Sequence, residues 1–397
     1  MDVAMSPRRR KRRRNQNRSA RGLRSCGAID AIPDDALELI LLLLDSQVSL
    51  LRAASTCKRW RRIAAGDAFL RRFSSLHELP VVAGSYHNSL LHARPRFVEP
   101  SPRPTDVDRG HFSLDFLPDN SIIQTRWSII DSKESILLLE REDKGTWDLI
   151  VCEPLTRRHE VIPPILTESG CYLRGQAFLL GGSGIGMSNF RVLCWVLGGG
   201  RTQAFMFTAG ASWCSMSIDS RKRYDLIGSA DRALYWHDGD RTVIAVDKAT
   251  AEFSYFLLPP GGFGMSTEKI AVAVGSDGEP RFVLSDGRAN GILKVFATAG
   301  GEWVLQLEKS IQLRAATATL HLPRWERWCF IHGVGGGQST GTLRVQTYTA
   351  GFKRLRKFSI DIETMKVESL PDMYMHRRTY PTMLPWPPSM HACTSDN

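Results

Sequence analysis

Two glycine-rich segments are the first places where this sequence could do chemistry, because closely spaced glycines let backbone N–H groups approach a phosphate. Gly182-Ser183-Gly184-Ile185-Gly186 begins like a G-x-G-x-x-G fingerprint, but Met187 stands where the third glycine belongs. The glycine run at residues 333–338 fails in the same way. Both segments therefore favour hairpin turns over nucleotide sites, and Ser183 lacks the G-x-S-x-G frame of a hydrolase nucleophile.

The residue types that bind metals or carry out acid–base chemistry are dispersed. Ten histidines and eight cysteines occur, without a G-x-x-x-x-G-K-[ST], H-E-x-x-H or C-x-x-C motif. His87 and His92 come closest to a pair, yet neither has a carboxylate at ligand spacing. Cysteines inside apolar runs, such as Cys194, are typical of small buried hydrophobes. The sequence thus predicts no catalytic residues, no metal site and no cofactor.

The N-terminus and the hydropathy pattern bear on location. The charged N-terminal run has no apolar core behind it, so we expect no secretory signal and a reducing compartment. The longest unbroken apolar run covers residues 39–44, far short of the roughly 20 residues that cross a membrane. We therefore expect no membrane partner, and a location in the nucleus, the cytoplasm or both.

Positive charge is concentrated in an N-terminal tail. The formal net charge is +11, of which residues 1–25 contribute +9 and the other 372 residues +2. Seven consecutive cations repel one another and have nothing apolar to fold around, so residues 1–25 are expected to be disordered. The run is typical of a nuclear localisation signal, with nucleic-acid adhesion or a tail without a role as alternatives. It consists of Arg8, Arg9, Arg10, Lys11, Arg12, Arg13 and Arg14.

The elements around which the chain is organised lie at residues 32–73. Pro33 suits a first helical turn, and Asp34 and Glu38 place negative charge at the positive end of that helix. Leucine and isoleucine surround the helix nearly completely, which indicates burial on more than one side. Ser46 suits the start of a second helix, and two more short helices follow. Some 42 residues cannot bury so much apolar surface alone, so the module is expected to dock onto a partner.

These helices resemble an F-box. The match runs through Ile32-Pro33, the leucine spacing of the first helix, and Cys57-Lys58-Arg59-Trp60-Arg61, although Ile32 replaces the usual leucine and Asp45-Ser46 an Arg-Leu-Pro-type helix ending. The resemblance covers residues 29–75 and implies binding to the Skp-type adaptor of cullin–RING ubiquitin ligases. An ordinary helical cap on the following domain is the alternative. The residues assigned to adaptor binding are Ile32, Pro33, Leu37, Ile40, Leu41, Leu44, Leu50, Leu51, Cys57, Trp60 and Ile63.

A connection and then a strand-rich region follow. Residues 79–84 resemble a strand or a connection, and prolines and charges between residues 94 and 110 favour a linker or covering loop. Residues 76–110 are assigned to this connection. From residue 111, strand-like runs alternate with turn residues, and three segments align on Thr156, Thr250 and Thr364. In each segment an acidic residue stands three positions before the threonine, and a proline follows downstream. The pattern predicts a hairpin whose turn N–H groups bond to the acid.

A second repeat alternates with the first. Phe205-Met206-Phe207 precedes Trp213 as Val295-Phe296 precedes Trp303. Since roughly 40–50 residues form one four-stranded blade, residues 111–386 are expected to form a mostly antiparallel β-propeller of about five or six blades. This region resembles the F-box-associated propeller-like domain of plant F-box proteins, especially those of the large grass families. A β-sandwich or an irregular β array is the alternative, and residues 387–397 are expected to be disordered.

Together these features predict an α+β multidomain chain, with a small helical F-box before an all-β domain. The resemblance implies a non-enzymatic substrate receptor of an SCF-type (Skp–cullin–F-box) ubiquitin ligase, which holds an unidentified client protein on the β domain. An enzyme built on a propeller would instead need carboxylates or histidines converging at one end of it. A nuclear nucleic-acid binder would need basic residues gathered on one face, and the near-neutral charge of residues 26–397 disfavours that partner.

Overall fold

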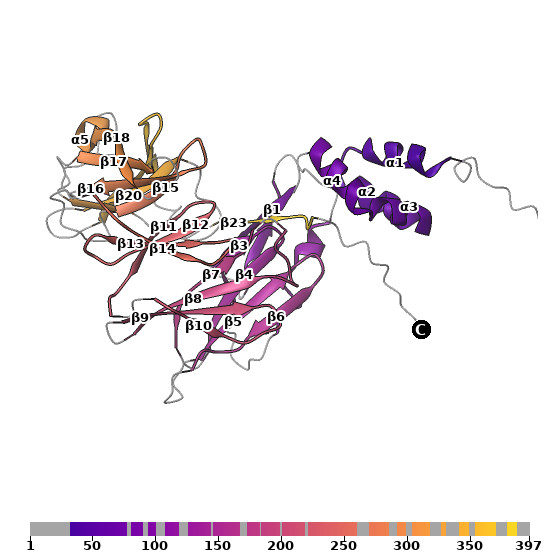
Figure 1. The fold of residues 1–397 in the computed structure, drawn as a ribbon, viewed down its shortest axis with the longest axis horizontal. Coiled ribbons are helices and arrows are strands. Elements are labelled where there is room, and N and C mark those ends of the chain that lie inside the picture. Colours follow the sequence, from indigo (N-terminus) through magenta and orange to yellow (C-terminus); the bar gives the residue numbers. More distant parts are fainter. Residues whose placement is uncertain are drawn as a thin grey trace, which may run out of the picture.

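Four helices lie beside a larger all-β body in the computed structural model of the chain (Figure 1). The residues that the structure describes are 32–77, 81–89, 94–100, 108–118, 126–143, 146–166, 173–182, 184–198, 201–218, 221–259, 270–285, 292–298, 304–317, 327–330, 341–348, 354–370 and 379–386. The basic run at residues 8–14 and the C-terminal residues 387–397 lie outside them.

The helical module consists of α1 (Asp34–Leu42), α2 (Gln47–Thr56), α3 (Lys58–Ala64) and α4 (Asp67–Leu76). As predicted, α1 begins after Pro33 with two aspartates in its first turn. The Ser46 hydroxyl accepts a hydrogen bond from Ser49 N at 3.2 Å and so caps α2. The side chains that form the core between the helices are Leu37, Leu41, Leu42, Leu50, Ala54, Ala64, Phe69 and Phe73.

The β body is a six-bladed propeller, counted over the described residues, which confirms the predicted fold class. Blade 1 contains β3 (Ser128–Lys133), β4 (Ile136–Asp143), β5 (Thr146–Glu153) and β6 (Arg158–Ile162). Blade 2 contains β7 (Gly175–Leu180), β8 (Arg191–Gly198), β9 (Arg201–Thr208) and β10 (Cys214–Met216). Blade 3 contains β11 (Asp225–Ser229), β12 (Ala233–His237), β13 (Thr242–Asp247) and β14 (Phe253–Leu257).

The remaining blades continue this order. Blade 4 contains β15 (Ile270–Val274), β16 (Pro280–Ser285), β17 (Ile292–Thr298) and β18 (Leu305–Gln312), followed by the short helix α5 (Leu313–Ala316). Blade 5 contains β19 (Arg327–Phe330), β20 (Thr342–Tyr348), β21 (Arg354–Asp361) and β22 (Val367–Leu370). Each sheet is antiparallel, and the first strands of adjoining blades contact one another, as β3 does β7 and β11 does β15.

Blade 6 is assembled from both ends of the chain. Its strands are β1 (Val82–His87), β2 (Arg96–Val98) and β23 (Thr379–Met383), in the order β2-β1-β23. Tyr86 pairs with Tyr380 in this sheet, and the Tyr86 hydroxyl donates to Phe112 O at 2.7 Å in the 3₁₀ turn η1 (Arg109–Phe112). Residues 76–110, assigned from sequence to a connection, thus contribute two propeller strands. β1 pairs on its other edge with β23, which lies about 300 residues away, so no local pattern could reveal that pairing.

The threonine repeat forms the predicted hairpin turns between the third and fourth strands of blades 1, 3 and 5. Asp247 Oδ1 accepts hydrogen bonds from Ala249 N at 2.7 Å and Thr250 N at 2.8 Å, and Asp361 Oδ1 holds its turn in the same way. In blade 1, where glutamate replaces aspartate, the Glu153 carboxylate accepts from the Thr156 hydroxyl instead. The residue after each threonine has a positive φ: 56° at Arg157, 65° at Ala251 and 63° at Met365.

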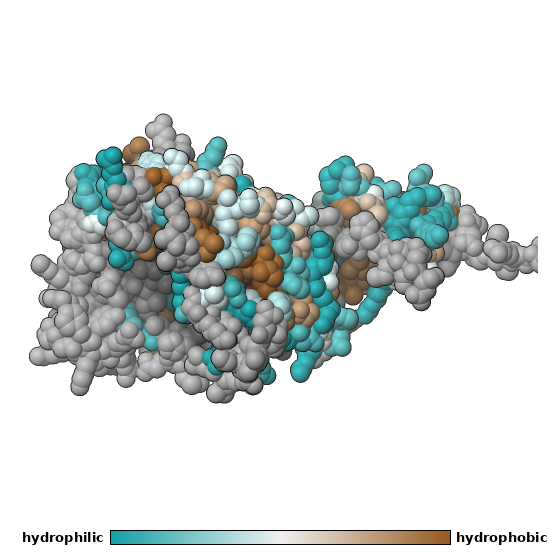
Figure 2. Space-filling view, turned by 90° about the horizontal axis from the view of Figure 1, so that it is seen from below, coloured by the Kyte–Doolittle hydropathy of each residue, from teal (hydrophilic) through white to brown (hydrophobic). Residues whose placement is uncertain are grey.

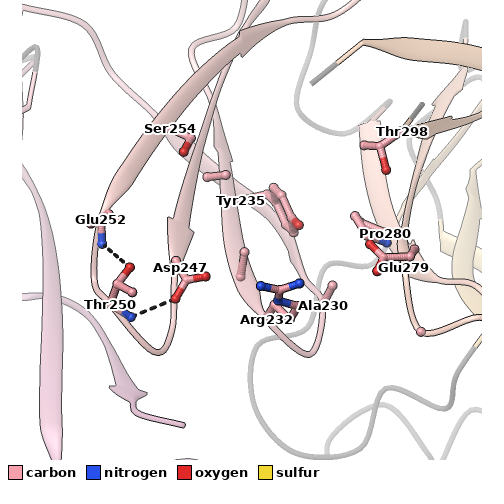
Figure 3. A pocket seen from close by; sticks show the side chains of 13 residues that line it. Ala230, Arg232, Tyr235, Asp247, Thr250, Glu252, Ser254, Glu279, Pro280 and Thr298 are labelled. Carbon is pink, nitrogen blue, oxygen red and sulfur yellow. Dashed lines mark hydrogen bonds between the residues drawn. The ribbon is translucent and has the colours of Figure 1, made fainter. Parts of the chain in front are cut away.

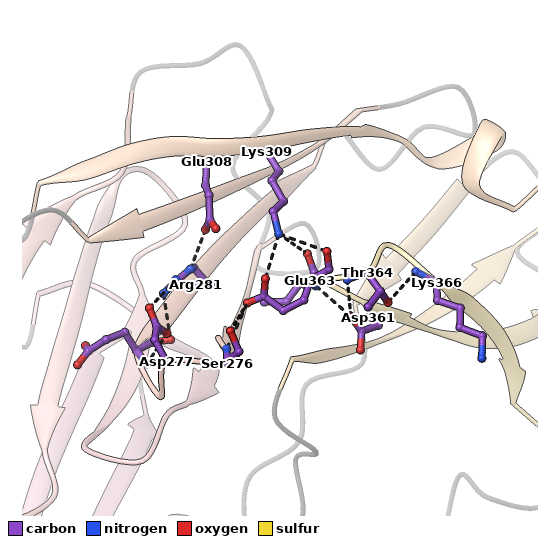
Figure 4. Close-up of polar contacts among 11 residues, drawn as sticks. Ser276, Asp277, Arg281, Glu308, Lys309, Asp361, Glu363, Thr364 and Lys366 are labelled. Atoms are coloured by element: carbon purple, nitrogen blue, oxygen red, sulfur yellow. Dashed lines mark hydrogen bonds and ion pairs between the residues drawn. The ribbon is translucent and has the colours of Figure 1, made fainter.

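Apolar and charged contacts join neighbouring blades. Trp195 and Trp236 stack between blades 2 and 3, with ring centroids 4.3 Å apart and planes at 16°. Between blades 4 and 5, Lys309 Nζ lies 3.0 Å from a Glu363 carboxylate oxygen, and Glu363 also accepts from Ser276 N (Figure 4). Contacts of this kind fix the angle between blades and therefore the shape of the surface that the turns present.

Candidate functional site

One face of α1 leaves large apolar side chains uncovered. Leu39 is 56% exposed, Ile40 44% and Leu43 83%, whereas Leu37 and Leu41 are fully enclosed by the module. Residues three and four apart lie on the same side of a helix, so these three side chains form one stripe, here called the α1 stripe. The rest of the module does not cover it, which leaves apolar surface for a partner.

Ion pairs join α1 to α3 and α4. The Asp34 carboxylate lies 2.6 Å from Arg59 and 2.8 Å from Arg62, both on α3, and Glu38 lies 2.7 Å from Arg72 on α4. The hydrogen bond from Arg59 lowers the pKa of the Asp34 carboxyl below its ordinary value. These exposed pairs add little stability singly. They lie on the side of α1 next to its neighbours, while burial of Leu37 and Leu41 in the module core leaves the α1 stripe facing outward.

The eleven residues assigned to adaptor binding divide into two groups. Leu37, Leu41 and Leu50 have no exposed surface, and their side chains hold the helices together. Pro33, Ile40 and Cys57 are exposed, and Ile32, Leu44, Leu51, Trp60 and Ile63 are partly exposed. Sequence reasoning missed Leu39 and Leu43, because a helix that is apolar nearly all round does not reveal which side its own module covers.

The helical module is attached to the propeller through the residues that follow β23. The Gln47 side-chain amide donates to Pro385 O, and the Trp386 ring lies 5.8 Å from the Phe73 ring with the planes at 22°. Val48 of α2 also packs against the core that blade 6 shares with blade 1. Side chains of α2 and α4 thus contact the residues that follow the last propeller strand, and these contacts fix the position of the module against the propeller. In the view of Figure 2 the module is mostly hydrophilic, whereas apolar residues gather over the middle of the propeller.

A cavity of about 600 Å³ opens between blades 3 and 4 (Figure 3). Blade 3 contributes residues of β12, β13 and β14 and of the turns on either side of them, and blade 4 contributes Gly278, Glu279, Pro280 and Thr298. Burial, followed by the nearby carboxylates of Glu279 and Asp247, raises the pKa of the Tyr235 phenol at the floor. Burial alone would raise the pKa of the Asp247 carboxyl, but the N–H groups of Thr250 and Ala249 outweigh it and lower that pKa. Asp247 is therefore ionised at neutral pH.

Two buried charges lie elsewhere in the propeller. Asp131 accepts hydrogen bonds from Leu179 N at 2.8 Å and Ser132 N at 2.9 Å, and burial raises the pKa of its carboxyl. Burial lowers the pKa of Lys248 to about 8, while its ammonium donates to Ser229 Oγ at 2.8 Å. Perturbed pKa values often mark functional sites. Here the groups bond to backbone and neighbouring strands, with Asp131 joining blade 1 to blade 2, so a structural role accounts for them.

Apart from Ser183, one of the two glycine-rich segments lies within the described residues. Gly182 and Gly184–Gly186 lie in the connection of the β7–β8 hairpin, as predicted, with Gly184 at φ 79°; Ser183, His92 and the glycine run at residues 333–338 lie outside the described residues. Among the described residues, no group of three His, Cys, Asp or Glu side chains is placed to hold a metal ion. Within the same residues, none of the helices has the length and apolar character needed to span a membrane.

Comparison with known proteins adds two family matches. A profile described as F-box-like matches residues 29–75, and one described as F-box protein AT5G49610-like, beta-propeller, matches residues 128–390. No curated protein matches the chain.

Similar solved structures share little sequence with the chain. TolB from Acinetobacter baumannii is 12% identical with a TM-score of 0.36, over 65% of this chain and 57% of that one. A post-proline cleaving enzyme from Rickettsia typhi is 9% identical with a TM-score of 0.33, over 63% of this chain and 45% of that one. The chain thus spans only about half the length of these two proteins. The second profile, in contrast, covers well over half of this chain, which therefore belongs to the family of F-box proteins with an AT5G49610-like β-propeller.

Proposed function

We propose that the protein is the substrate receptor of an SCF-type E3 ubiquitin ligase. The F-box binds a Skp-type adaptor, and through it a cullin–RING ligase, while the propeller binds a client protein. The chain itself needs no catalytic residues in this role, because tethering raises the effective concentration of the client near a conjugating enzyme. The family membership supports the class of protein, and F-box domains generally bind such adaptors.

The single observation that carries the proposal is the α1 stripe. Leu39, Ile40 and Leu43 are apolar, adjacent and exposed on a module whose own core is already complete. Burying apolar area contributes about 25 cal/mol per Å², so covering each of these side chains with a partner contributes on the order of 1–2 kcal/mol. Partly exposed residues of α3, such as Trp60 and Ile63, provide further apolar surface on the module.

The test replaces the stripe without touching the core. Leu39→Asp/Leu43→Asp in the full chain should weaken binding of a purified Skp-type adaptor at least about 100-fold, measured by titration calorimetry. The matched control is Leu166→Asp/Leu307→Asp, which changes two leucines of the propeller that are each 55% exposed and should leave adaptor affinity unchanged. Equal affinities for the wild type and the stripe variant would contradict the proposal.

A second pair of variants separates docking from folding. Leu37→Asp/Leu41→Asp places two charges in the enclosed core of the module, so its helices should unfold and adaptor binding should disappear with them. Circular dichroism should show lost helix in this variant and unchanged helix in Leu39→Asp/Leu43→Asp. Lost helix in both variants would mean that the stripe maintains the module and is not a docking surface.

We also propose that the run from Arg8 to Arg14 is a nuclear localisation signal. Its support is the concentration of +9 of the +11 net charge in residues 1–25. Replacing the seven cations by glutamine should move a fluorescent fusion from the nucleus towards the cytoplasm while adaptor affinity stays the same. Unchanged nuclear accumulation would refute this role of the tail.

A further inference from the structure

The cavity between blades 3 and 4 has an apolar floor and a charged rim. Ala233, Tyr235 and Pro280 are buried at its base, while Arg232, Glu252 and Glu279 are exposed around it. Figure 3 shows side chains of the two blades facing one another across the space, with Tyr235 between them. A cavity of about 600 Å³ lies within the range of about 300–1,000 Å³ that is common for ligand pockets, and its lining exposes more polar than apolar surface.

The charges around the cavity are unbalanced. Three carboxylates, those of Asp247, Glu252 and Glu279, line it together with one guanidinium, that of Arg232. Asp247 is held ionised by the turn N–H groups, and the field of Asp247 and Glu279 acts on the phenol of Tyr235 at the floor. The cavity therefore favours a positively charged group, since formal charge at its rim is negative overall.

The cavity lies at the end of the propeller where the helical module is attached. Its rim includes the β11–β12 and β15–β16 turns. These turns join the first and second strands of blades 3 and 4, as the β3–β4 turn with Glu134 does in blade 1. Met383 N, at the end of β23, donates to Glu134 O at 2.8 Å, three residues before Trp386 contacts α4. A client segment seated in the cavity would thus lie on the same end of the propeller as the F-box.

We propose that this cavity binds an arginine or lysine side chain in an extended segment of the client protein. The inference rests on the proposed function and names the chemistry that the client would present. The aliphatic stem of the side chain would pack against the apolar floor, and its cationic head would meet Asp247 and Glu279. Thr298 and Ser254 at the walls offer hydroxyl groups to the backbone of the segment.

The test uses the full chain, both alone and with a Skp-type adaptor, and two fluorescein-labelled octapeptide libraries. The libraries share the same mixture of Ala, Ser and Leu at seven positions and differ only at the fourth, which is arginine in one and neutral citrulline in the other. Fluorescence polarisation should show about tenfold tighter binding of the arginine library, with the difference shrinking as salt is raised. Equal binding of both libraries, or no binding of either, would overturn the proposal.

Charge-reversal variants locate the effect. Glu252→Lys/Glu279→Lys changes two exposed rim residues and should abolish the preference for arginine. Glu142→Lys/Glu368→Lys changes the net charge by the same amount at exposed ion pairs in blades 1 and 5. This variant should retain the preference for arginine. A preference lost in both variants would overturn the assignment to this cavity. Equally strong binding of free arginine amide would also overturn it, because a small cation and not a client segment would then be the occupant.

Adaptor affinity is measured on the same samples, so the two proposals fail separately. Arginine-dependent peptide binding by a chain that does not bind the adaptor would support the cavity and contradict the ligase role. Adaptor binding without a preference for the arginine library would support the ligase role and contradict the assignment of the cavity.

Discussion

Trp386 connects the F-box to the end of the propeller. Its half-buried ring packs against the module core and stacks on Phe73 at 5.8 Å. A Trp side chain buries 150–250 Å² when enclosed, so about 100 Å² is lost in Trp386→Ala, which corresponds to about 2.5 kcal/mol at 25 cal/mol per Å². The stacked contact adds about 0.5 kcal/mol or more. The helical module should therefore become about 3 kcal/mol less stable, which is roughly a 100-fold rise in its open population.

Hydrogen exchange measured by mass spectrometry can resolve this change by segment. Peptides from α1 to α4 should exchange about 100-fold faster in Trp386→Ala, while peptides from β12 and β13 in blade 3 keep their protection. Trp213→Ala is the matched control, since that ring is also half-buried but contacts Phe207 and Pro163 in the propeller. Unchanged exchange in the helices would refute the reasoning, and so would an equal loss of protection in blade 3.

Two smaller perturbations test the turns and the buried histidine. Asp361→Ala removes the acceptor for Glu363 N and Thr364 N and should lower the free energy of thermal unfolding by about 1 kcal/mol. Asp361→Asn keeps an acceptor and should lower it by only a few tenths of a kcal/mol. Equal losses in the two variants would argue against the turn hydrogen bonds. Burial lowers the pKa of His237 below its ordinary 6.5, so the unfolded state binds the proton more readily than the folded state. The free energy of unfolding should therefore fall as the pH drops below about 6.5, by up to about 1.4 kcal/mol per pH unit. Denaturant midpoints between pH 7 and 5 should thus fall less in His237→Asn, whose amide oxygen can accept from Gly239 N as Nδ1 does, and parallel curves would contradict this.

The features that the sequence predicted are those set by neighbouring residues. The aspartate three positions before Thr250 and Thr364 bonds the turn N–H groups because the turn is local, so its geometry follows from four residues. The same holds for Ser46 at the start of α2. The repeat of such turns indicates a propeller without reference to any long-range contact.

What the sequence could not predict depends on contacts between distant residues. Val82 pairs with Met383 in blade 6, and neither residue carries a local sign of the other. The outward face of α1 is set by the side chains of the other helices that enclose Leu37 and Leu41, so leucine spacing alone could not separate the α1 stripe from the core. The cavity between blades 3 and 4 joins turns that lie about 45 residues apart, and none of its residues forms a motif.

The composition of blade 6 has a consequence for biosynthesis. A ribosome that adds about 5–20 residues per second needs roughly 15–60 s to proceed from β1 to β23, and β1 waits throughout with one edge unpaired. Unpaired strand edges invite pairing with other chains, so the nascent protein is exposed to aggregation until its last strand emerges. The F-box also lacks Trp386 during this interval. Premature termination that removes only the final twenty residues would thus affect both the first blade strand and the helical module, and chaperones should retain such a product.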